Sequence, residues 1–410
     1  MNLILRLSIL ILIIIVVEFY FTRKVLSIVS NLFPVDKPYK VRRIIIALIL
    51  FFNLFLIVGV MVLVYFAVFG NAPNFPPDNF LFDVFLQFPF WLFVLYVIQC
   101  TLLFIMIDLL RLVLYPFYKS RKDKVKKIVF DLQFLILLFF LLYVPARAYH
   151  DFNTVSVRVV EYEKKNLPKV LEGFKLVLIA DVQADKYTNK KRLGNFIDKV
   201  NQTKPDLVLI AGDVITSTPD YIGLSAEYIG QIKSKYGVYA CVGDHDNWAY
   251  RRDTERSLRE VIAALAAKNI LMIDNKIKTI KVDSTKIGIS FITNNYVHSI
   301  NKNLLDSLSS ISDSLNLKIF LTHQPRPYLV DKAREKNYDL FLAGHTHGGQ
   351  LTFWFPFFNL SPTLVETKYV RGDFHFGNML AVVNRGLGMS LVPLRYNSTP
   401  EITVIVLASK

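Results

Sequence analysis

The sequence predicts an α/β domain of buried strands and amphipathic helices that follows a membrane region of four transmembrane helices. Two observations predict this organisation. Apolar residues make up 53% of the 410-residue chain, and long apolar runs are concentrated in roughly its first 150 residues. Beyond that point, short wholly apolar runs alternate with segments of helical spacing, a texture typical of strands buried between layers of helices. The predicted domains are therefore 1–149 and 150–410.

Each of the four apolar stretches is long enough to cross the hydrocarbon core of a bilayer, which takes about 20 residues of helix. They cover residues 3–21, 44–69, 88–114 and 128–144. The first stretch lacks a strongly basic start and a small-residue cleavage site, so it is interpreted as a retained span and not as a signal peptide. Glu18, Asp108 and Asp131 lie toward span ends and are interpreted as interfacial residues, the alternative being an ion pathway.

The charge of the connecting loops predicts the orientation. Residues 22–43 and 117–127 are rich in Lys and Arg, whereas residues 70–80 contain neither. The positive-inside rule places both basic loops in the cytoplasm, so the chain after about Arg147 is predicted to be extracytoplasmic, at a plasma or inner membrane. The net charge of +15 is assigned to these membrane flanks, and no nucleic-acid-binding signature is visible. Cys100 and Cys241, the two cysteines, indicate no disulfide framework.

The strands of the second domain are predicted in chain order. Val155, Val157 and Val159 alternate with polar neighbours and predict a half-buried strand. Buried strands are predicted at 175–180, 207–211, 238–242, 287–292, 318–321 and 340–343. Two further strands, near 380–383 and 402–407, have no helix between them. Part of the sheet system is therefore predicted to be mixed or antiparallel.

Polar clusters follow five of the buried strands. They are Asp181-Val182-Gln183, Gly212-Asp213, Gly243-Asp244-His245-Asp246, Thr322-His323-Gln324 and Gly344-His345-Thr346-His347. Ligands of layered α/β folds bind at the carboxyl ends of strands, and extended backbone directs residues i and i+2, such as His345 and His347, to one face. A single Asp in such a place could be a helix cap, but five strand ends that each deliver Asp or His predict a metal site.

The clusters resemble, in the same order, the motifs D-x-H, G-D, G-N-H-[DE], H and G-H-x-H of the calcineurin-like metallophosphoesterase superfamily. The resemblance covers roughly residues 155–408. The tail segments 383–390, 393–395 and 400–402 look most like those of the bacterial membrane-associated branch. The resemblance implies an α/β/β/α sandwich and a hydrolase that acts on phosphoric ester bonds.

The resemblance also implies two divalent metal ions. One ion would take Asp181, Gln183, Asp213 and His347, and the other would take Asp213 as a bridge together with Asp244, His323 and His345. His245 matches the family's catalytic histidine, and Asp246 matches the acidic residue after it. Mixed nitrogen and oxygen ligands suit Mn, Fe or Zn.

The chain departs from the family pattern at two of these positions. Gln183 stands where the family has histidine, and Asp244 where it has asparagine. A glutamine can still coordinate through its carbonyl oxygen, and an aspartate adds charge. We therefore expect a competent centre with altered metal preference, the alternative being a degenerate centre with weak occupancy of the first site.

The predicted function is a membrane-anchored metallophosphoesterase that hydrolyses a phosphodiester, phosphomonoester or pyrophosphate. A hydroxide held between two metals would attack phosphorus, and His245 would bind a phosphoryl oxygen or protonate the leaving oxygen. Asp246 would orient His245 or cap the following helix. Arg385 and Arg395 could bind a second phosphate or an anionic headgroup, although surface salt bridges explain such arginines equally well.

The substrate is predicted to be lipid-linked, with the lipid bilayer as the chain's partner and no obligate protein partner indicated. The connection from the last span to the strand at 175 is short, so the domain is expected close to the membrane. The apolar segment 351–358 would be either a buried loop core or a lip in contact with lipid. One alternative function is a catalytically weakened binding or sensor protein with a degenerate metal site. Another is a transporter with a regulatory module, but the predicted spans lack charged or glycine-broken midsections.

Overall fold

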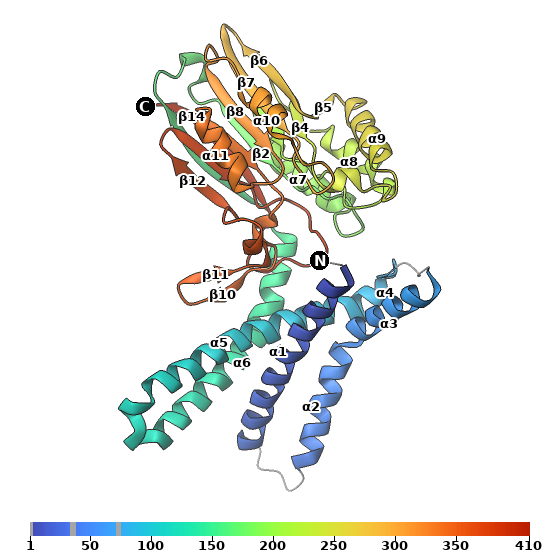
Figure 1. Cartoon of the computed structure of the whole chain (residues 1–410), viewed down its shortest axis with the longest axis vertical. Coiled ribbons are helices and arrows are strands. Elements are labelled where there is room, and N and C mark those ends of the chain that lie inside the picture. The colour runs from blue at the N-terminus through green and yellow to red at the C-terminus, as the bar shows by residue number, and fades with distance from the viewer. Residues whose placement is uncertain (1–2, 33–37, 71–74) are drawn as a thin grey trace. The chain divides into compact units, whose positions relative to one another are not determined.

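The computed structural model describes residues 3–32, 38–70 and 75–410 (Figure 1). Contacts divide the chain into two units. The helical unit comprises Met1–Tyr149 with Phe353–Leu360, and the sandwich unit comprises His150–Thr352 with Ser361–Lys410. The predicted domains 1–149 and 150–410 differ from these units by the segment 353–360.

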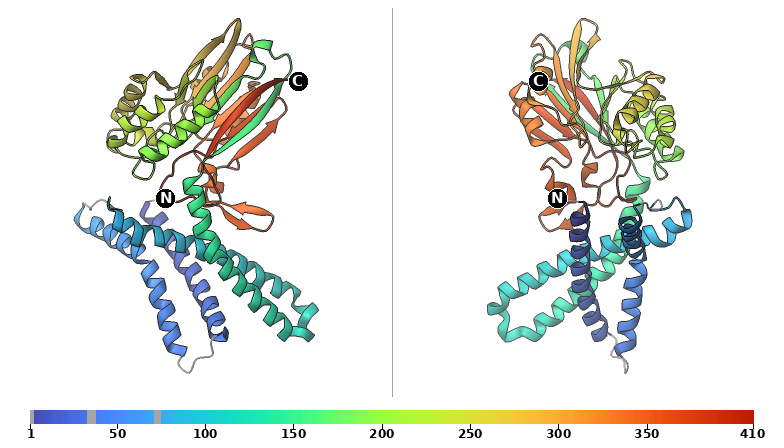
Figure 2. Two further views of the ribbon diagram at one scale, coloured as in Figure 1. Left: turned by 180° about the vertical axis from the view of Figure 1, so that it is seen from behind. Right: turned by 45° about the vertical axis from the view of Figure 1, so that its right-hand side comes forward.

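The helical unit contains the apolar stretches that were predicted to span the membrane. Its helices are α1 (Leu3–Leu32), α2 (Pro38–Phe52), α3 (Leu54–Phe69), α4 (Phe80–Phe82), α5 (Phe88–Tyr118) and α6 (Lys122–Asn153). Helices α5 and α6 run side by side (Figure 2), and the Tyr96 hydroxyl of α5 donates to the Leu137 carbonyl of α6. The unit also contains a small hairpin of β10 (Phe353–Phe355) and β11 (Phe358–Leu360).

The four predicted spans are not confirmed. By length and apolar composition, one described helical stretch could cross a membrane, Phe80–Asn153, which includes both α5 and α6. A second candidate arises if α2 and α3, which are bent by 53°, count as one span. The bend occurs at Asn53, whose side-chain Nδ2 donates to both carboxylate oxygens of Glu18 at 3.2 and 3.0 Å. One polar residue in a long apolar run did not reveal this break, so residues 44–69 were predicted as a single span.

The predicted orientation stays a prediction. The orientation was predicted from three loops. Two of these loops include residues 33–37 and 71–74, which lie outside the described residues. Of the acidic residues predicted at span ends, Asp108 accepts hydrogen bonds from Tyr20 and Lys24 at 2.8 and 2.9 Å, and Asp131 is exposed.

The sandwich unit is built on two six-stranded mixed sheets, which confirms the prediction of mixed sheets. The first has the order β1 (Ser156–Lys164), β14 (Glu401–Ser409), β2 (Lys175–Ile179), β3 (Leu207–Ile210), β4 (Val238–Cys241) and β5 (Ile270–Ile273). The second has the order β12 (Gly372–Phe376), β13 (Met379–Val383), β9 (Leu340–Ala343), β8 (Leu317–Thr322), β7 (Thr285–Ile292) and β6 (Lys276–Val282). Strand β14 is antiparallel to β2, and β6 and β12 are antiparallel edge strands.

Alternating side chains of each central strand pack into different layers. In β2, Leu176 and Leu178 lie between the two sheets, whereas Val177 and Ile179 pack against helices. The helices α7 (Lys190–Gln202), α8 (Ile222–Ile229) and α9 (Thr254–Ala266) cover the first sheet, and α10 (Lys302–Ser309) and α11 (Pro327–Glu335) cover the second. Strands such as β2, β3 and β9 are apolar and buried on both faces, so the polar residues that follow them lie at their ends.

Candidate metal centre

The structure brings the polar ends of strands from both sheets together. The main-chain amide of His345, after β9, donates to both carboxylate oxygens of Asp181, after β2, at 3.1 and 3.0 Å. His323, after β8, has its Nδ1 2.6 Å from the carbonyl oxygen of Ala211, after β3. The carboxyl edges of the two sheets therefore meet along one line, as the positions of the motifs predicted.

Two groups of side chains at this edge could each hold a metal ion. One group is Asp244, His323 and His345, and the other is Asp181, Asp213 and His323, with the ligand atoms of each group within 4.8 Å of one another. The first group lies within the predicted ligand set of the second ion. The second group contains two predicted ligands of the first ion and adds His323, which is common to both groups. The bridging role of Asp213 stays a prediction.

The two remaining predicted ligands lie against the same cluster. His347 Nε2 is 3.6 Å from Asp181 Oδ1, and Gln183 Nε2 donates to Asp213 Oδ2 at 3.0 Å. All seven predicted ligands are thus close together, and their metal-binding roles stay predictions.

The backbone of the cluster is strained. Five of the seven predicted ligands lie in the left-handed region: Asp181 (φ 50), Gln183 (φ 48), Asp213 (φ 59), His345 (φ 71) and His347 (φ 49). A non-glycine residue in this region costs about 1–3 kcal/mol and persists only where its surroundings enforce it. Such concentration of strain is typical of a functional site.

Glycines allow the loops to approach this closely. A Cβ atom at Gly243 would lie 2.1 Å from Asp213 Oδ1, and one at Gly344 would lie 2.8 Å from Asp181 Oδ2. Any side chain at either position would push a carboxylate out of the cluster.

Burial and neighbouring charges set the protonation of the cluster. Burial raises the pKa of Asp181 to about 7. Burial also disfavours the charged form of Asp244, but hydrogen bonds with His323 and His345 outweigh it and lower the pKa of Asp244. The pKa of His347 lies well below its usual value because of burial and the nearby charge of Arg395. His347 is therefore neutral, which is the form of imidazole that binds metals.

The donor set fits divalent metal ions. Three buried carboxylates share this edge with the ring nitrogens of three histidines, and buried charges of this density are normally paired or coordinate metals. The carbonyl oxygen Oε1 of Gln183 is buried without a hydrogen-bond partner. An unsatisfied acceptor beside carboxylates fits a cation, so both departures from the family pattern, Gln183 and Asp244, leave an oxygen ligand in place.

His245 is held at the rim of the cluster. Its ring Nδ1 contacts the carbonyl oxygen of Thr216, and its Nε2 lies 3.1 Å from Ser390 Oγ. The Trp248 ring packs edge-on against it with centroids 4.6 Å apart. These contacts on both nitrogens and on one face define the orientation of the imidazole.

Asp246 binds main-chain amides and does not cap α9, while its predicted role of orienting His245 stays a prediction. Its carboxylate accepts hydrogen bonds from the main-chain amides of Asp213, Val214 and Gly243 at 2.8–3.0 Å, so it ties the loop after β3 to the loop after β4. Asp253, not Asp246, caps the following helix α9. The fully buried carboxylate thereby satisfies three loop amides.

The two predicted phosphate-binding arginines differ in placement. Arg395 is fully buried and donates to the carbonyl oxygens of His347, Arg385, Gly388 and Ser398. Binding of a phosphate by Arg395 is not supported by this placement, because its guanidinium is already engaged in holding loops. Arg385 is partly exposed and pairs with Glu401 at 3.2 Å, and its role stays a prediction.

Three residues that contact the predicted ligands were missed. Gln324 donates to both oxygens of Asp244 at 2.9 Å, and the main-chain amide of Tyr296 donates to Asp244 at 2.6 Å. Glu366 lies 3.0 Å from His345 Nε2, and this hydrogen bond is the main reason that the pKa of Glu366 is lowered to about 2. Gln324 follows His323 directly, which was a usable signal. Tyr296 and Glu366 stand in segments with no motif.

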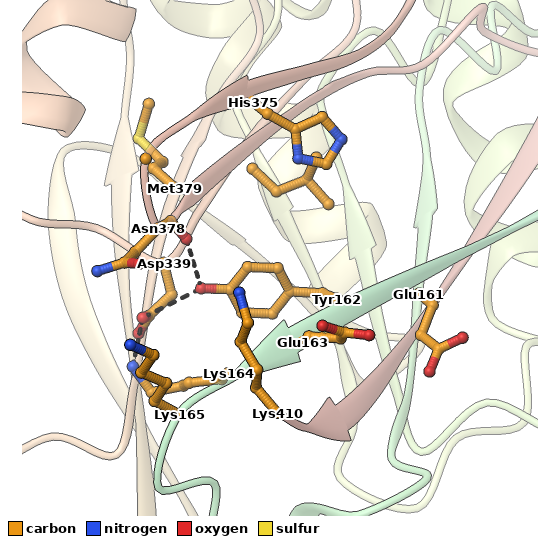
Figure 3. A pocket seen from close by; sticks show the side chains of 12 residues that line it. Glu161, Tyr162, Glu163, Lys164, Lys165, Asp339, His375, Asn378, Met379 and Lys410 are labelled. Atoms are coloured by element: carbon orange, nitrogen blue, oxygen red, sulfur yellow. Dashed lines mark hydrogen bonds and ion pairs between the residues drawn. The ribbon is translucent and has the colours of Figure 1, made fainter.

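A separate cavity of 350 Å³ lies at the opposite edge of the sheets (Figure 3). Asp339, which precedes β9, pairs there with Lys164 at the end of β1, and the Tyr162 hydroxyl donates to the Asn378 carbonyl oxygen at 2.8 Å. The cavity contains none of the predicted site residues. The volume of this cavity therefore does not indicate the position of the candidate metal site.

Comparisons with known proteins agree with the motif order. The family model for calcineurin-like phosphoesterases matches residues 174–349. The uncharacterised metallophosphoesterase YkuE of Bacillus subtilis is 32% identical over 247 residues, which cover 59% of this chain and 82% of YkuE. The uncharacterised metallophosphoesterase Cj0846 of Campylobacter jejuni is 27% identical over 393 residues, which cover 93% of this chain and 98% of Cj0846. A Danio rerio protein named transmembrane protein with metallophosphoesterase domain is 27% identical over 260 residues, covering 60% of this chain and 56% of that protein.

Proposed function

Since the chain belongs to the calcineurin-like metallophosphoesterase family and is a phosphoric ester hydrolase, we propose that it is a membrane-anchored enzyme with two divalent metal ions and a lipid-linked substrate. The scissile bond would be a phosphodiester, a phosphomonoester or a pyrophosphate. The observation that carries the proposal is the convergence of Asp181, Asp213, Asp244, His323 and His345 at one edge of the sandwich.

The residues of the chain have separate tasks in this mechanism. The aspartates and histidines of the two groups would hold the ions, with Gln183 Oε1 as an additional oxygen ligand. When bound, two divalent ions of Mn, Fe or Zn supply Lewis acidity, which activates water and neutralises phosphoryl charge. His245, whose ring is oriented by Thr216 and Ser390, would hydrogen-bond a phosphoryl oxygen or protonate the leaving oxygen from Nε2.

Two observations support the membrane part of the proposal. The helical unit contains a stretch that is long and apolar enough to cross a bilayer, and a matched relative is named as a transmembrane protein with a metallophosphoesterase domain. We propose four spans, an extracytoplasmic catalytic domain and membership of the bacterial membrane-associated branch. Substrate lipid and enzyme would then share one bilayer, which raises their encounter frequency.

Metal removal and restoration test the proposal. Full-length protein in detergent is treated with a chelator, dialysed, and assayed on bis(p-nitrophenyl) phosphate and on a fluorescent phospholipid with Mn²⁺, Fe²⁺ or Zn²⁺ added back. We expect activity to vanish on chelation and to return with one of these ions, and the restored protein to contain two ions per chain. Full activity without metal contradicts the mechanism. Less than one ion per chain, together with no turnover, favours the alternative of a binding or sensor protein with a degenerate site.

A further inference from the structure

The hairpin β10–β11 belongs to a different unit from the loop that precedes it. Residues 353–360 group with the helical unit. On either side of them, the amide of Thr352 donates to the Tyr396 carbonyl at 2.8 Å and Ser361 Oγ donates to the Gly349 carbonyl at 3.1 Å, both within the sandwich unit. The chain therefore leaves the sandwich directly after the His345–His347 motif and returns after one hairpin.

A buried side chain of the helical unit pairs with the hairpin. Gln99, on α5, is fully buried, and its Nε2 donates to the carbonyl oxygen of Trp354 at 2.7 Å. The amide of Trp354 donates in return to Gln99 Oε1 at 2.9 Å. The side-chain amide of Gln99 thus pairs with β10 as a third strand would, through both of its polar atoms.

The pairing satisfies main-chain groups at the open edge of the hairpin, as an apolar medium would require. Trp354 is opposite Asn359 in the register of the hairpin, and its amide and carbonyl face away from β11. An unpaired strand edge in hydrocarbon costs several kcal/mol for each polar group.

The side chains of the hairpin tip are apolar and exposed. Trp354 and Phe358 are 50% and 53% exposed, and Phe357 is fully exposed. Helix α5, to which the hairpin is attached, also exposes leucines such as Leu109 and Leu112. Aromatic side chains that cluster on an exposed surface mark an interaction site, and Trp and Phe favour the interface of a bilayer.

We propose that the hairpin β10–β11 is a lipid-contacting element whose aromatic tip enters the bilayer interface, and that Gln99 is the positioning residue that locks it to α5. Only residues 348–352 separate His347 from the hairpin in the sequence. The hairpin thereby couples the loop of His345 and His347 to the membrane surface. The effect of the hairpin on hydrolysis of a lipid substrate rests on the proposed function, whereas its contact with lipid does not.

Lipid contact is tested by the fluorescence of Trp354, which needs no activity. The chain has three tryptophans, so Trp91→Phe and Trp248→Phe leave Trp354 as the only one. In phosphatidylcholine vesicles with brominated acyl chains, we expect strong quenching of Trp354, and weaker quenching when Gln99→Leu is added. Fluorescence equal to that in unbrominated vesicles overturns the proposal.

The positioning role is tested by comparing two substrates. Gln99→Leu should lower kcat/KM for a fluorescent phospholipid in vesicles by about tenfold to a hundredfold, the cost of a misplaced reacting group, and leave hydrolysis of bis(p-nitrophenyl) phosphate unchanged. The matched control is Gln133→Leu on α6, a buried glutamine that takes no part in the pairing with Trp354, for which both rates should stay at the wild-type value.

The outcomes separate the two proposals. Equal losses on both substrates for Gln99→Leu would show a merely structural glutamine and overturn the positioning role. Phe357→Asp should reproduce the selective loss, whereas Phe357→Leu should retain activity on the phospholipid. A wild-type protein that hydrolyses only the soluble ester would refute the lipid-linked substrate, while quenching of Trp354 would still show that the hairpin contacts lipid.

Discussion

The two opposite edges of the sandwich differ in the kind of structure that they hold. The edge that carries the candidate metal ligands has Asp181, Asp213 and His345 in strained loops. The opposite edge has a cavity of 350 Å³ lined by residues such as Tyr162 and Asp339, and none of its described lining residues other than Gly377 has a positive φ. This cavity therefore lies away from the candidate metal ligands. Buried charged side chains that converge on a strained backbone are a better indicator of a functional site than the volume of a cavity.

The largest expected difference between the edges concerns His245. His245→Asn should lower kcat by about 10²–10⁴-fold, the usual contribution of an acid–base group, and leave the metal content unchanged, because His245 belongs to neither metal-binding group. Steady-state kinetics and elemental analysis of the restored protein measure the two quantities. The control is His375→Asn, at the opposite edge, which should behave as wild type. An active His245→Asn variant would remove this residue from the mechanism.

An intermediate effect is expected at Glu366. Because Glu366 lies 3.0 Å from His345 Nε2, Glu366→Gln should weaken metal affinity by about 10–100-fold, as loss of a ligand's hydrogen-bond partner does. Competition with a fluorescent chelator gives the affinity. Glu163→Gln at the opposite edge is the matched substitution and should leave the affinity unaltered. Equal affinities for both variants would show that Glu366 does not support the centre.

The smallest effect is expected at the opposite edge itself. Tyr162→Phe removes the hydrogen bond to the Asn378 carbonyl and should lower the free energy of unfolding by about 0.5–1.5 kcal/mol. Denaturant titration of the purified chain measures this change, and kcat and metal affinity should not move. A loss of activity in Tyr162→Phe would show that the two edges are functionally coupled and would contradict this expectation.

Much of the sandwich could be predicted because its physical signals are local. Wholly apolar runs of strand length, such as those that form β2, β3 and β9, occur where both faces are buried. The convergence of these polar residues at one edge could also be predicted, since the polar residue after each such run must lie at a strand end. The mixed sheets followed from two strands with no helix between them.

The remaining features depend on contacts between distant segments. Glu366 lies beside His345 only because the loop after the hairpin returns to the site. Arg395 resembles a phosphate ligand in the sequence but is buried among carbonyl oxygens of four different loop residues. At the bend between α2 and α3, Asn53 donates to Glu18, which is on another helix. No local sequence pattern predicts such contacts, because the two partners are distant in the sequence and meet only in the folded chain.

The position of β14 has a consequence for biosynthesis. Strand β14 lies between β1 and β2 in the first sheet, although more than half of the chain separates it from both in sequence. A ribosome that adds about 5–20 residues per second produces β14 roughly 10–45 s after β2. Throughout that interval β1 has no neighbour and the edge of β2 is open to pairing with other chains. Completion of this sheet is therefore a late and non-local event, during which the nascent protein depends on protection from aggregation.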